Sequence, residues 1–349
     1  MTADALGGVW TYAIELSQAL ADHDVEVTLC VMGPAPDAEQ SSDLAGSPVA
    51  RAYVGEYALE WMDDPWEDVE RAGQWLLEIA ADVKPDVVHL NGYVHAPLPW
   101  DAPVVVVGHS DVLSWHEAVR SRPAGPEWSR YREEVAVGLA AAHLLVAPTH
   151  AMLDELVRLY EPSCQRLVIP NGSGRAFPPL PKSQLVLGAG RVWDEAKNVE
   201  ALVRVAPRLE WPIVVCGDGA VGDGVTALGR LDREQLDRML ASTAIFAAPA
   251  RYEPFGLAAL EAARAGCALV LGDIPSLREV WGSTALYVPP DDDDELERAL
   301  HLLINHPDLR AEYASRARRR ANGFTAERMA DGYASAYRRL FRKTVVGAA

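Results

Sequence analysis

The chain has 349 residues, 49% of them hydrophobic and 23% charged, which is enough apolar material to bury the cores of two domains. Its formal net charge of -18 argues against nucleic-acid binding and against broad adhesion to anionic lipid, because both depend on basic surface. The four cysteines lack C-x-x-C spacing, no apolar run approaches the roughly 20 residues that span a bilayer, and no signal-peptide pattern is present, so we expect a cytoplasmic protein without a transmembrane segment.

The first predicted helix opens on a pair of glycines. Gly7 and Gly8 precede an amphipathic pattern that runs to about Leu20, and glycines at a helix start permit the close approach of a phosphate. An ordinary turn is the alternative interpretation. The preceding residues 2–4 read like the end of a buried strand, and because such strands run about five or six residues, we expect the natural protein to begin upstream of Met1.

Short apolar runs alternate with helical patterns along most of the chain, as is typical of parallel strands connected by helices. The predicted strands are 25–32, 87–90, 104–107, 144–147, 167–169, 185–187, 213–216, 244–248 and 268–271. These are too many for one ordinary sheet, and the segment 170–182, rich in Pro, Gly and Ser, divides them into two groups. We therefore predict an α/β fold with two doubly wound, Rossmann-like domains that face a ligand-binding cleft.

Polar residues follow two predicted strands of the first half. His109 comes just after the valine run 104–107, at the edge where an α/β sheet presents its chemistry, and it is our candidate for a catalytic contact. A histidine that caps the following helix is the alternative. The second polar strand end, His89-Leu90-Asn91, is a weaker candidate.

In the second half, Arg191 ends a predicted strand and Lys197 begins the next helical pattern. An arginine binds a diphosphate bidentately, while a lysine acts as a point charge, so the pair could hold a diphosphate. Alternatively, the two cations balance Asp194 and Glu195 on the surface.

Two carboxylates, Glu253 and Glu261, lie eight residues apart around a predicted helix start. Pro254 suits a first helical turn, and the amides near Phe255 and Gly256 are expected to be unpaired, so a phosphate could bind there. Glu261, over a turn into the helix, could reach a second polar group such as a ribose diol. In the alternative interpretation Glu261 pairs with Arg264 on a solvated face, and Glu253 only complements the helix dipole.

The string from Glu253 to Glu261 resembles the E-x7-E signature of retaining glycosyltransferases of family 4, the group 1 glycosyltransferases, which have the GT-B fold. The arginine and Lys-Asn pair at 191–198 and the glycine-rich loop at 7–8 also resemble this family. The resemblance implies an acceptor domain at 1–174, a nucleotide-sugar domain at 184–322, and a last helix, 326–343, that packs back on the first domain.

The resemblance also implies the reaction: metal-independent transfer of a hexose from a nucleoside diphosphate sugar to an acceptor hydroxyl, with retained anomeric configuration and no cofactor. His109 and Glu253 are then the catalytic residues, Glu253 holding the sugar hydroxyls and His109 the sugar from the opposite wall. The implied donor-binding residues are Gly7, Gly8, Arg191, Lys197, Phe255, Gly256, Leu257 and Glu261. No metal ligand is expected. The sequence leaves the acceptor open between a glycan, a lipid-linked sugar and a small molecule.

Two other functions stay open on the sequence. Another GT-B enzyme, such as an epimerase or a phosphorylase, would share the cleft, and a non-catalytic sugar-nucleotide-binding protein would bind donor without turnover. Among the charged runs, Asp291 to Asp294 is interpreted as a solvated helix start. The basic run 316–320 and the later Arg338, Arg339, Arg342 and Lys343 are interpreted as charged helix faces, with peripheral contact to the inner membrane face as the alternative.

Overall fold

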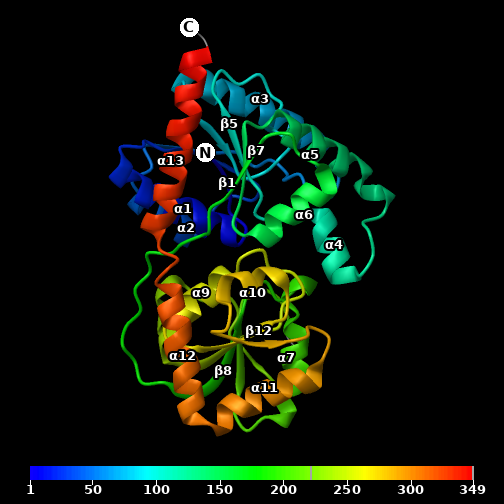
Figure 1. The fold of residues 1–349 in the computed structure, drawn as a ribbon, viewed down its shortest axis with the longest axis vertical. Coiled ribbons are helices and arrows are strands. Elements are labelled where there is room, and N and C mark those ends of the chain that lie inside the picture. Colours follow the sequence, from blue (N-terminus) through cyan, green and yellow to red (C-terminus); the bar gives the residue numbers. More distant parts are fainter. Residues whose placement is uncertain (221, 348–349) are drawn as a thin grey trace. The chain divides into compact units, whose positions relative to one another are not determined.

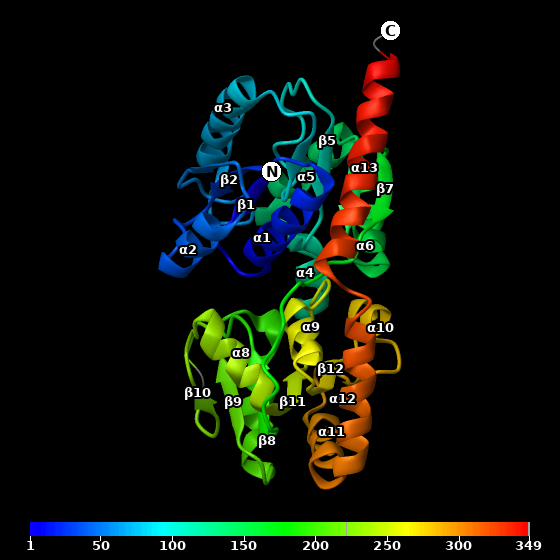
Figure 2. The same cartoon turned by 90° about the vertical axis from the view of Figure 1, so that its left-hand side faces the viewer.

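The computed structural model describes residues 1–220 and 222–347, with side chains as far as Phe341, and the chain divides into two compact units (Figures 1 and 2). Unit 1 consists of Met1–Gly172 together with the C-terminal helix α13 (Ala326–Gly347), and unit 2 is Ser173–Thr325. The side chains of Arg342 and Lys343, two of the basic residues noted above, lie outside the described residues.

Unit 1 is an α/β unit whose described strands form parallel sheets in the orders β1-β2-β3 and β4-β5-β6-β7. The strands are β1 (Thr2–Asp4), β2 (Thr28–Met32), β3 (Arg51–Val54), β4 (Val88–Leu90), β5 (Val104–Val107), β6 (Leu144–Ala147) and β7 (Gln165–Val168). The helices are α1 (Gly8–Leu20), α2 (Ala38–Gly46), α3 (Trp66–Val83), α4 (Val112–Arg120), α5 (Ser129–Ala141), α6 (His150–Tyr160) and α13, with short 3-10 turns at Ala21–His23 and Pro126–Trp128.

Asn91 joins the two sheets of unit 1. It follows β4, and its backbone amide donates to Thr2 Oγ1 at 2.9 Å while its side-chain Nδ2 donates to the Thr2 carbonyl at 2.7 Å. Thr2 lies in β1, and all of Thr2–Asp4 is buried, so residues 2–4 do form the buried strand that the sequence predicts. The carboxyl end of β4 therefore lies beside the start of β1.

The last helix completes the core of unit 1. Figures 1 and 2 show α13, in red, alongside α1. One buried cluster combines Tyr12 and Leu16 of α1, Val31 of β2, Val107 of β5, and Met329 and Tyr333 of α13. The helix between Ala326 and Gly347 is thus an integral part of this unit.

Unit 2 is built on one parallel sheet, in the described residues, with the order β10-β9-β8-β11-β12-β13. The strands are β8 (Ser183–Ala189), β9 (Ile213–Cys216), β10 (Thr226–Ala227), β11 (Thr243–Ala248), β12 (Ala268–Gly272) and β13 (Leu286–Val288). The helices are α7 (Val199–Val205), α8 (Arg233–Ser242), α9 (Leu257–Arg264), α10 (Pro275–Trp281), α11 (Asp293–Asn305) and α12 (Pro307–Ala321), with 3-10 turns at Glu195–Lys197 and Ala206–Arg208.

The sheet of unit 2 is covered on both faces. Ile245 packs with Leu202 of α7 and Leu300 of α11, whereas its neighbour Phe246 packs on the opposite face with Leu260 of α9 and Leu277 of α10. Because both faces are buried, the central strands read as continuous apolar runs, and the predictions 213–216, 244–248 and 268–271 match β9, β11 and β12 to within one residue. In unit 1, the predictions 104–107 and 144–147 likewise coincide with the fully buried strands β5 and β6.

Three edge strands and one helix start differ from the expectation. The edge strands β3, β10 and β13 were missed; β3 and β10 are mostly exposed and carry no apolar run. Helix α9 begins at Leu257, so Pro254 lies before the helix and not in its first turn. The acidic run does start a helix, α11, where the side chain of Asp292 accepts a hydrogen bond from the amide of Glu295.

Candidate functional site

The predicted site residues lie in both units: Gly7, Gly8 and His109 in unit 1, and the remainder in unit 2. In unit 2, the loop after β8 brings Gly190 and Lys197 together. Gly190 has a φ of 146°, and a Cβ added there would lie 3.6 Å from the Lys197 side chain. A Cβ on Gly217, after β9, would lie 1.7 Å from the Gly190 carbonyl oxygen. The backbones therefore approach closely at this strand edge, which only glycines permit.

Arg191 is held beside Asp194. Its Nη2 lies 2.7 Å from Asp194 Oδ2, and its guanidinium stacks on the ring of Trp193 at 5.2 Å from the centroid. Asp194 is buried, and its Oδ1 accepts from the Ala196 amide at 3.0 Å, which caps the short turn before Lys197. The pairing with Asp194 is the one that the surface-cation interpretation predicted, yet a buried carboxylate fixes Arg191 in a defined position.

Lys197 and Glu253 form an ion pair, with Nζ 2.6 Å from Oε2. The other carboxylate oxygen, Glu253 Oε1, accepts from the Gly256 amide at 3.0 Å. This amide was expected to be unpaired, and the structure corrects that expectation. Ser276 Oγ donates to the Glu253 carbonyl at 2.5 Å. Glu253 is thus fixed through its carboxylate and its backbone carbonyl.

Gly256 is the N-cap of α9, with a φ of 91° that favours glycine. No side chain caps the first amides of this helix, so the N-terminus of α9 keeps its capacity to bind an anion. Phe255 is 2% exposed and its ring packs edge-on against Phe324 at 5.6 Å. Phe255 can therefore contact a ligand only through its backbone, while Leu257 is half-buried.

A pocket lies at the carboxyl ends of β8 and β11. Lys197, Glu253 and Gly256 supply its polar and backbone surface, and Val199, Ala250 and Leu277 contribute apolar lining. Its volume is about 440 Å³, including space open to solvent. The arrangement pairs one cation and one carboxylate with a helix N-terminus, which suits a ligand that carries both phosphate and hydroxyl groups.

Glu261 lies in the middle of α9 and is 7% exposed. It forms an ion pair with Arg175, which also binds Asp237 of α8, while Arg264 donates to the Arg175 carbonyl at 3.0 Å. The expected alternative, a pair between Glu261 and Arg264 on a solvated face, is therefore wrong. Burial raises the pKa of Glu261, and the Arg175 guanidinium opposes that rise. Arg175 was missed because a single arginine in a Pro- and Gly-rich segment gives no signal of its distant partners.

In unit 1, His109 and His89 share one acceptor, Asn91 Oδ1, at 2.9 and 3.1 Å from their Nε2 atoms. Because Asn91 Nδ2 donates to Thr2, Oδ1 is the accepting atom and both histidines carry a proton on Nε2. Nδ1 of His89 then accepts from the Tyr337 hydroxyl at 2.5 Å. Burial lowers the pKa of both His89 and His109 to about 3, so both rings are neutral at pH 7.

Tyr12 connects this histidine pair to the glycine-rich loop. Its ring packs edge-on against His109, with centroids 4.4 Å apart, and it lies one turn into α1. Gly7 is the N-cap of α1 with a φ of 67°, both Gly7 and Gly8 are exposed, and no side chain caps the helix. The start of α1 and His109 are thus neighbours within unit 1. The strand end His89-Leu90-Asn91 was only a weaker candidate in the sequence, because the contacts of Asn91 with both histidines become visible only in the fold.

Within residues 1–220 and 222–347, no group of three or more His, Cys, Asp or Glu side chains is placed to hold a metal ion. In the same part of the chain, no helix has both the length and the apolar character needed to cross a bilayer. The basic residues of α12 bind within unit 2: Arg316 donates to Ser283 and Arg320 to the Val280 carbonyl.

Two family models match the chain. Residues 6–173 match the model described as Glycosyltransferase Family 4, and residues 175–320 match Glycosyl transferases group 1. Among curated proteins, the chain is 28% identical to glycogen synthase of Mycobacterium tuberculosis, over 90% of this chain and 86% of the relative. It is 27% identical to D-inositol 3-phosphate glycosyltransferase of Xylanimonas cellulosilytica, over 97% of this chain and 94% of the relative.

Solved structures share the fold. Sucrose-phosphate synthase from Thermosynechococcus elongatus superimposes with a TM-score of 0.82 at 19% identity, covering 98% of this chain and 96% of that one. HepE of Anabaena, solved in complex with UDP-glucose, superimposes with a TM-score of 0.73 at 17% identity, covering 97% of this chain and 100% of that one. This likeness shows the GT-B fold, and the two adjoining family matches, with the curated relatives, show that the chain is an enzyme of the family 4, group 1 glycosyltransferases.

Proposed function

We propose that this glycosyltransferase moves a sugar from a nucleoside diphosphate sugar to an acceptor hydroxyl, with retention of the anomeric configuration and without a metal ion. The observation that carries the proposal is the group formed by Lys197, Glu253 and the Gly256 amide at the N-terminus of α9. It combines an anion-binding end with a carboxylate that can accept hydrogen bonds from sugar hydroxyls.

In this proposal the donor exchanges partners with the protein. The diphosphate takes Lys197 away from Glu253, and Glu253 turns its released oxygen to the hydroxyls of the transferred sugar. Arg191, fixed by Asp194, binds the diphosphate as a second cation. Each charge that the donor uses is thus already neutralised in the free protein, so little uncompensated charge has to be buried before the donor arrives.

The chemical step needs no protein nucleophile. The bond between the anomeric carbon and the phosphate oxygen breaks, and its electron pair stays on the diphosphate. Lys197, Arg191 and the amides at the start of α9 stabilise that growing charge more in the transition state than in the ground state. The acceptor oxygen attacks the same face, and its proton passes to a phosphate oxygen, which gives retention.

The remaining residues hold the two ends of the donor. Glu261, steadied by Arg175, accepts hydrogen bonds from the ribose hydroxyls. Neutral His109, with its Nε2 proton directed to Asn91, keeps Nδ1 as an acceptor for a hydroxyl of the transferred sugar. Gly7 and Gly8 allow the diphosphate to approach the start of α1.

A donor panel tests the proposal. Nucleoside diphosphate sugars are screened for thermal stabilisation, beginning with UDP-glucose because HepE was solved with it. A ligand at a hundred times its dissociation constant adds about 2.7 kcal/mol to the free energy of unfolding. The stabilising donor is then incubated with acceptors, and NMR assigns the anomeric configuration of the product. An inverted product would contradict retention. Sugar conversion without an acceptor would indicate an epimerase, and phosphate-dependent cleavage a phosphorylase.

The proposed reaction does not depend on a metal ion. Turnover proceeds at the same rate with excess chelator, and lost activity that magnesium or manganese restores would contradict metal independence.

We also place the enzyme in the cytoplasm. None of Cys30, Cys164, Cys216 and Cys267 forms a disulfide, as is usual in a reducing compartment.

A further inference from the structure

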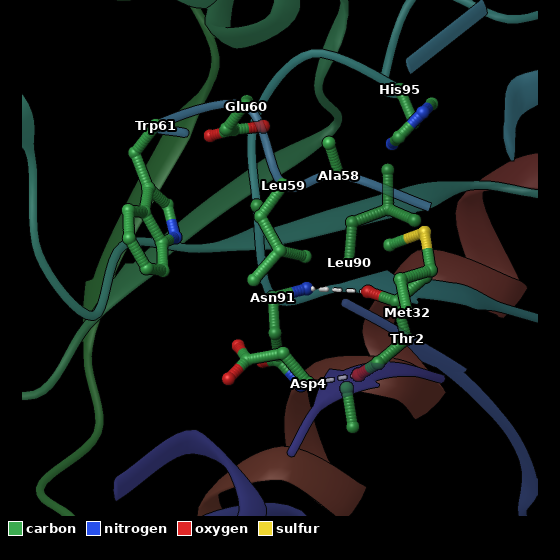
Figure 3. Close-up of a pocket in the computed structure, with 12 residues that line it drawn as sticks. Thr2, Asp4, Met32, Ala58, Leu59, Glu60, Trp61, Leu90, Asn91 and His95 are labelled. Atoms are coloured by element: carbon green, nitrogen blue, oxygen red, sulfur yellow. Dashed lines mark hydrogen bonds between the residues drawn. The ribbon is translucent and has the colours of Figure 1, made fainter. Parts of the chain in front are cut away.

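A pocket in unit 1 opens at the carboxyl ends of β1, β2 and β4, and it takes no part in the donor contacts described above (Figure 3). Its volume is about 510 Å³, including space open to solvent. Figure 3 shows Glu60 and Trp61 on one side and Asp4 with Asn91 on another. The pocket is thus formed where strands that are distant in sequence end together.

Glu60 is fixed at the pocket wall by the backbone that follows β4. Its carboxylate accepts hydrogen bonds from the Tyr93 amide at 3.1 Å and the Val94 amide at 3.1 Å. A Cβ on Gly92 would lie 3.1 Å from Glu60 Oε2, so the chain approaches this carboxylate closely. A carboxylate has about four acceptor positions, which leaves Glu60 able to accept further hydrogen bonds from hydroxyl groups in the pocket.

The other polar groups of the pocket also suit hydroxyls. Asp4 is mostly buried and accepts from the Leu6 amide at 2.8 Å, which fixes its carboxylate at the end of β1. Trp61 is 38% exposed and offers a flat apolar face of the kind on which a sugar ring can pack. Asp4 and Glu60 are both acids, and no lysine or arginine is among the described residues that line the pocket.

Asn91 links the pocket to the histidine pair. Asn91 lines the pocket, and the same Asn91 Oδ1 accepts the proton of His109 Nε2. A molecule bound between Glu60 and Asn91 therefore contacts the hydrogen-bond partner of His109, the residue that we propose to contact the transferred sugar. This adjacency connects the pocket with the reaction.

We infer that this pocket binds the acceptor, and that the acceptor is an uncharged polyhydroxyl compound, such as a sugar or a cyclitol, without a phosphate group at the bound ring. The inference rests on the proposed function, because it assigns the hydroxyl that attacks the donor. Asp4 and Glu60 accept hydrogen bonds from ring hydroxyls, and Trp61 packs against the ring. At pH 8, where Glu60 is ionised, the same two carboxylates repel a phosphate, since like charges placed together in a pocket reduce affinity strongly.

Matched acceptor pairs test the inference. With the donor identified in the thermal screen, turnover is compared for myo-inositol against inositol 3-phosphate and for glucose against glucose 6-phosphate, with maltotetraose as a longer neutral acceptor. At least one neutral compound is expected to exceed its phosphorylated partner by about tenfold or more in kcat/KM. Equal or better use of the phosphorylated partner would overturn the inference, and so would donor hydrolysis with no use of any neutral acceptor.

Charge-removing variants test the named carboxylates. The preference is the ratio of kcat/KM for the neutral acceptor to kcat/KM for its phosphorylated partner. At pH 8, Glu60→Gln and Asp4→Asn should each lower this ratio at least threefold. Glu78→Gln, on the exposed face of α3, should leave it unchanged. Two variants are used because Glu60→Gln also loses an amide contact, and their melting temperatures are recorded. An unchanged preference in both folded variants would refute the role of the pocket.

Failure of the underlying function gives a different result. If no nucleoside diphosphate sugar stabilises the protein or is consumed, the proposed transfer reaction itself is wrong. If the donor binds and is consumed while phosphorylated acceptors are preferred, only the acceptor inference falls.

Discussion

Lys197 Nζ lies 2.6 Å from Glu253 Oε2, so the cation assigned to the diphosphate and the carboxylate assigned to the sugar neutralise each other in the free protein. The two residues are far apart in the sequence and lie in the segments that follow β8 and β11. Their pairing explains how a half-buried site can hold both charges before the donor binds, and it predicts that neither residue can be changed without affecting the other.

Removing either cation should slow the reaction. We expect Arg191→Ala and Lys197→Ala each to lower kcat about a hundredfold, the usual scale for the loss of one charge-stabilising group. Arg238→Ala is the control, because Arg238 pairs with Glu234 on the exposed surface of α8. Near-normal turnover in both test variants with a true donor would show that the phosphate is bound elsewhere.

The two glutamates should separate kinetically. Glu253→Gln is expected to reduce kcat even at saturating donor, since Glu253 contacts the reacting sugar, whereas Glu261→Gln should mainly raise KM for the donor. Steady-state kinetics over a range of donor concentrations measures both effects. The reverse pattern would exchange the two roles.

Arg175 should be essential for stability. Arg175→Met removes the guanidinium that binds both Glu261 and Asp237, and breaking a buried ion pair in this way costs about 3–5 kcal/mol. Urea unfolding of the variant measures the loss. Arg158→Met is the matched control, because Arg158 pairs with Glu155 at an exposed site where such a pair contributes about 1 kcal/mol or less. Equal effects of the two substitutions would contradict the prediction.

Glu60 should make stability depend on pH. Burial raises the pKa of Glu60 from 4.5 to about 7. Between these values the folded protein holds a proton that the unfolded chain has released, so this contribution to the free energy of unfolding falls as pH rises and is constant above about 7. In urea titrations, the free energy of unfolding of the wild type minus that of Glu60→Gln should therefore fall from pH 5 to pH 7. The same subtraction with Glu78→Gln should show no such trend. A difference that is independent of pH would disprove the raised pKa.

Asn91 should control the protonation of His109. In the native protein burial lowers the pKa of His109 to about 3. Asn91→Asp places a negative charge 2.9 Å from His109 Nε2, and an opposite charge at such a distance raises a histidine pKa by about one to three units. NMR titration of the histidine ring measures the change, and the acid limb of the activity profile should move in the same direction. Asn91→Ser, which adds no charge, is the control.

The sequence predicted the central strands well and the side-chain partnerships poorly. The valine run of β5 is buried on both faces and therefore stands out as a strand, whereas β3 begins at exposed Arg51 and has no apolar run. The E-x7-E string located Glu253 and Glu261. It could not reveal that Lys197 and Arg175 neutralise them, because these contacts join residues 56 and 86 positions apart. The start of α9 was misplaced because Pro254 suits both a turn and a first helical position.

The acceptor pocket was missed for a similar reason. Glu60 lies in a segment without regular structure, and nothing in its neighbourhood distinguishes it from a solvated acid. Its significance depends on the amides of Tyr93 and Val94, which reach it only after β4 takes its place beside β1.

The packing of α13 in unit 1 has a consequence for biosynthesis. Tyr333 and Met329 fill the core beside α1, and the Tyr337 hydroxyl donates to His89, yet the ribosome makes these residues after all of unit 2. Chains emerge from the ribosome N-terminal end first, so the apolar face of α1 waits for its partner while all of residues 21–325 are translated. Unit 2 can finish folding during synthesis. A prematurely terminated chain would therefore expose the α1 face and become a target for chaperones and proteases, which prevents a half-made enzyme from accumulating.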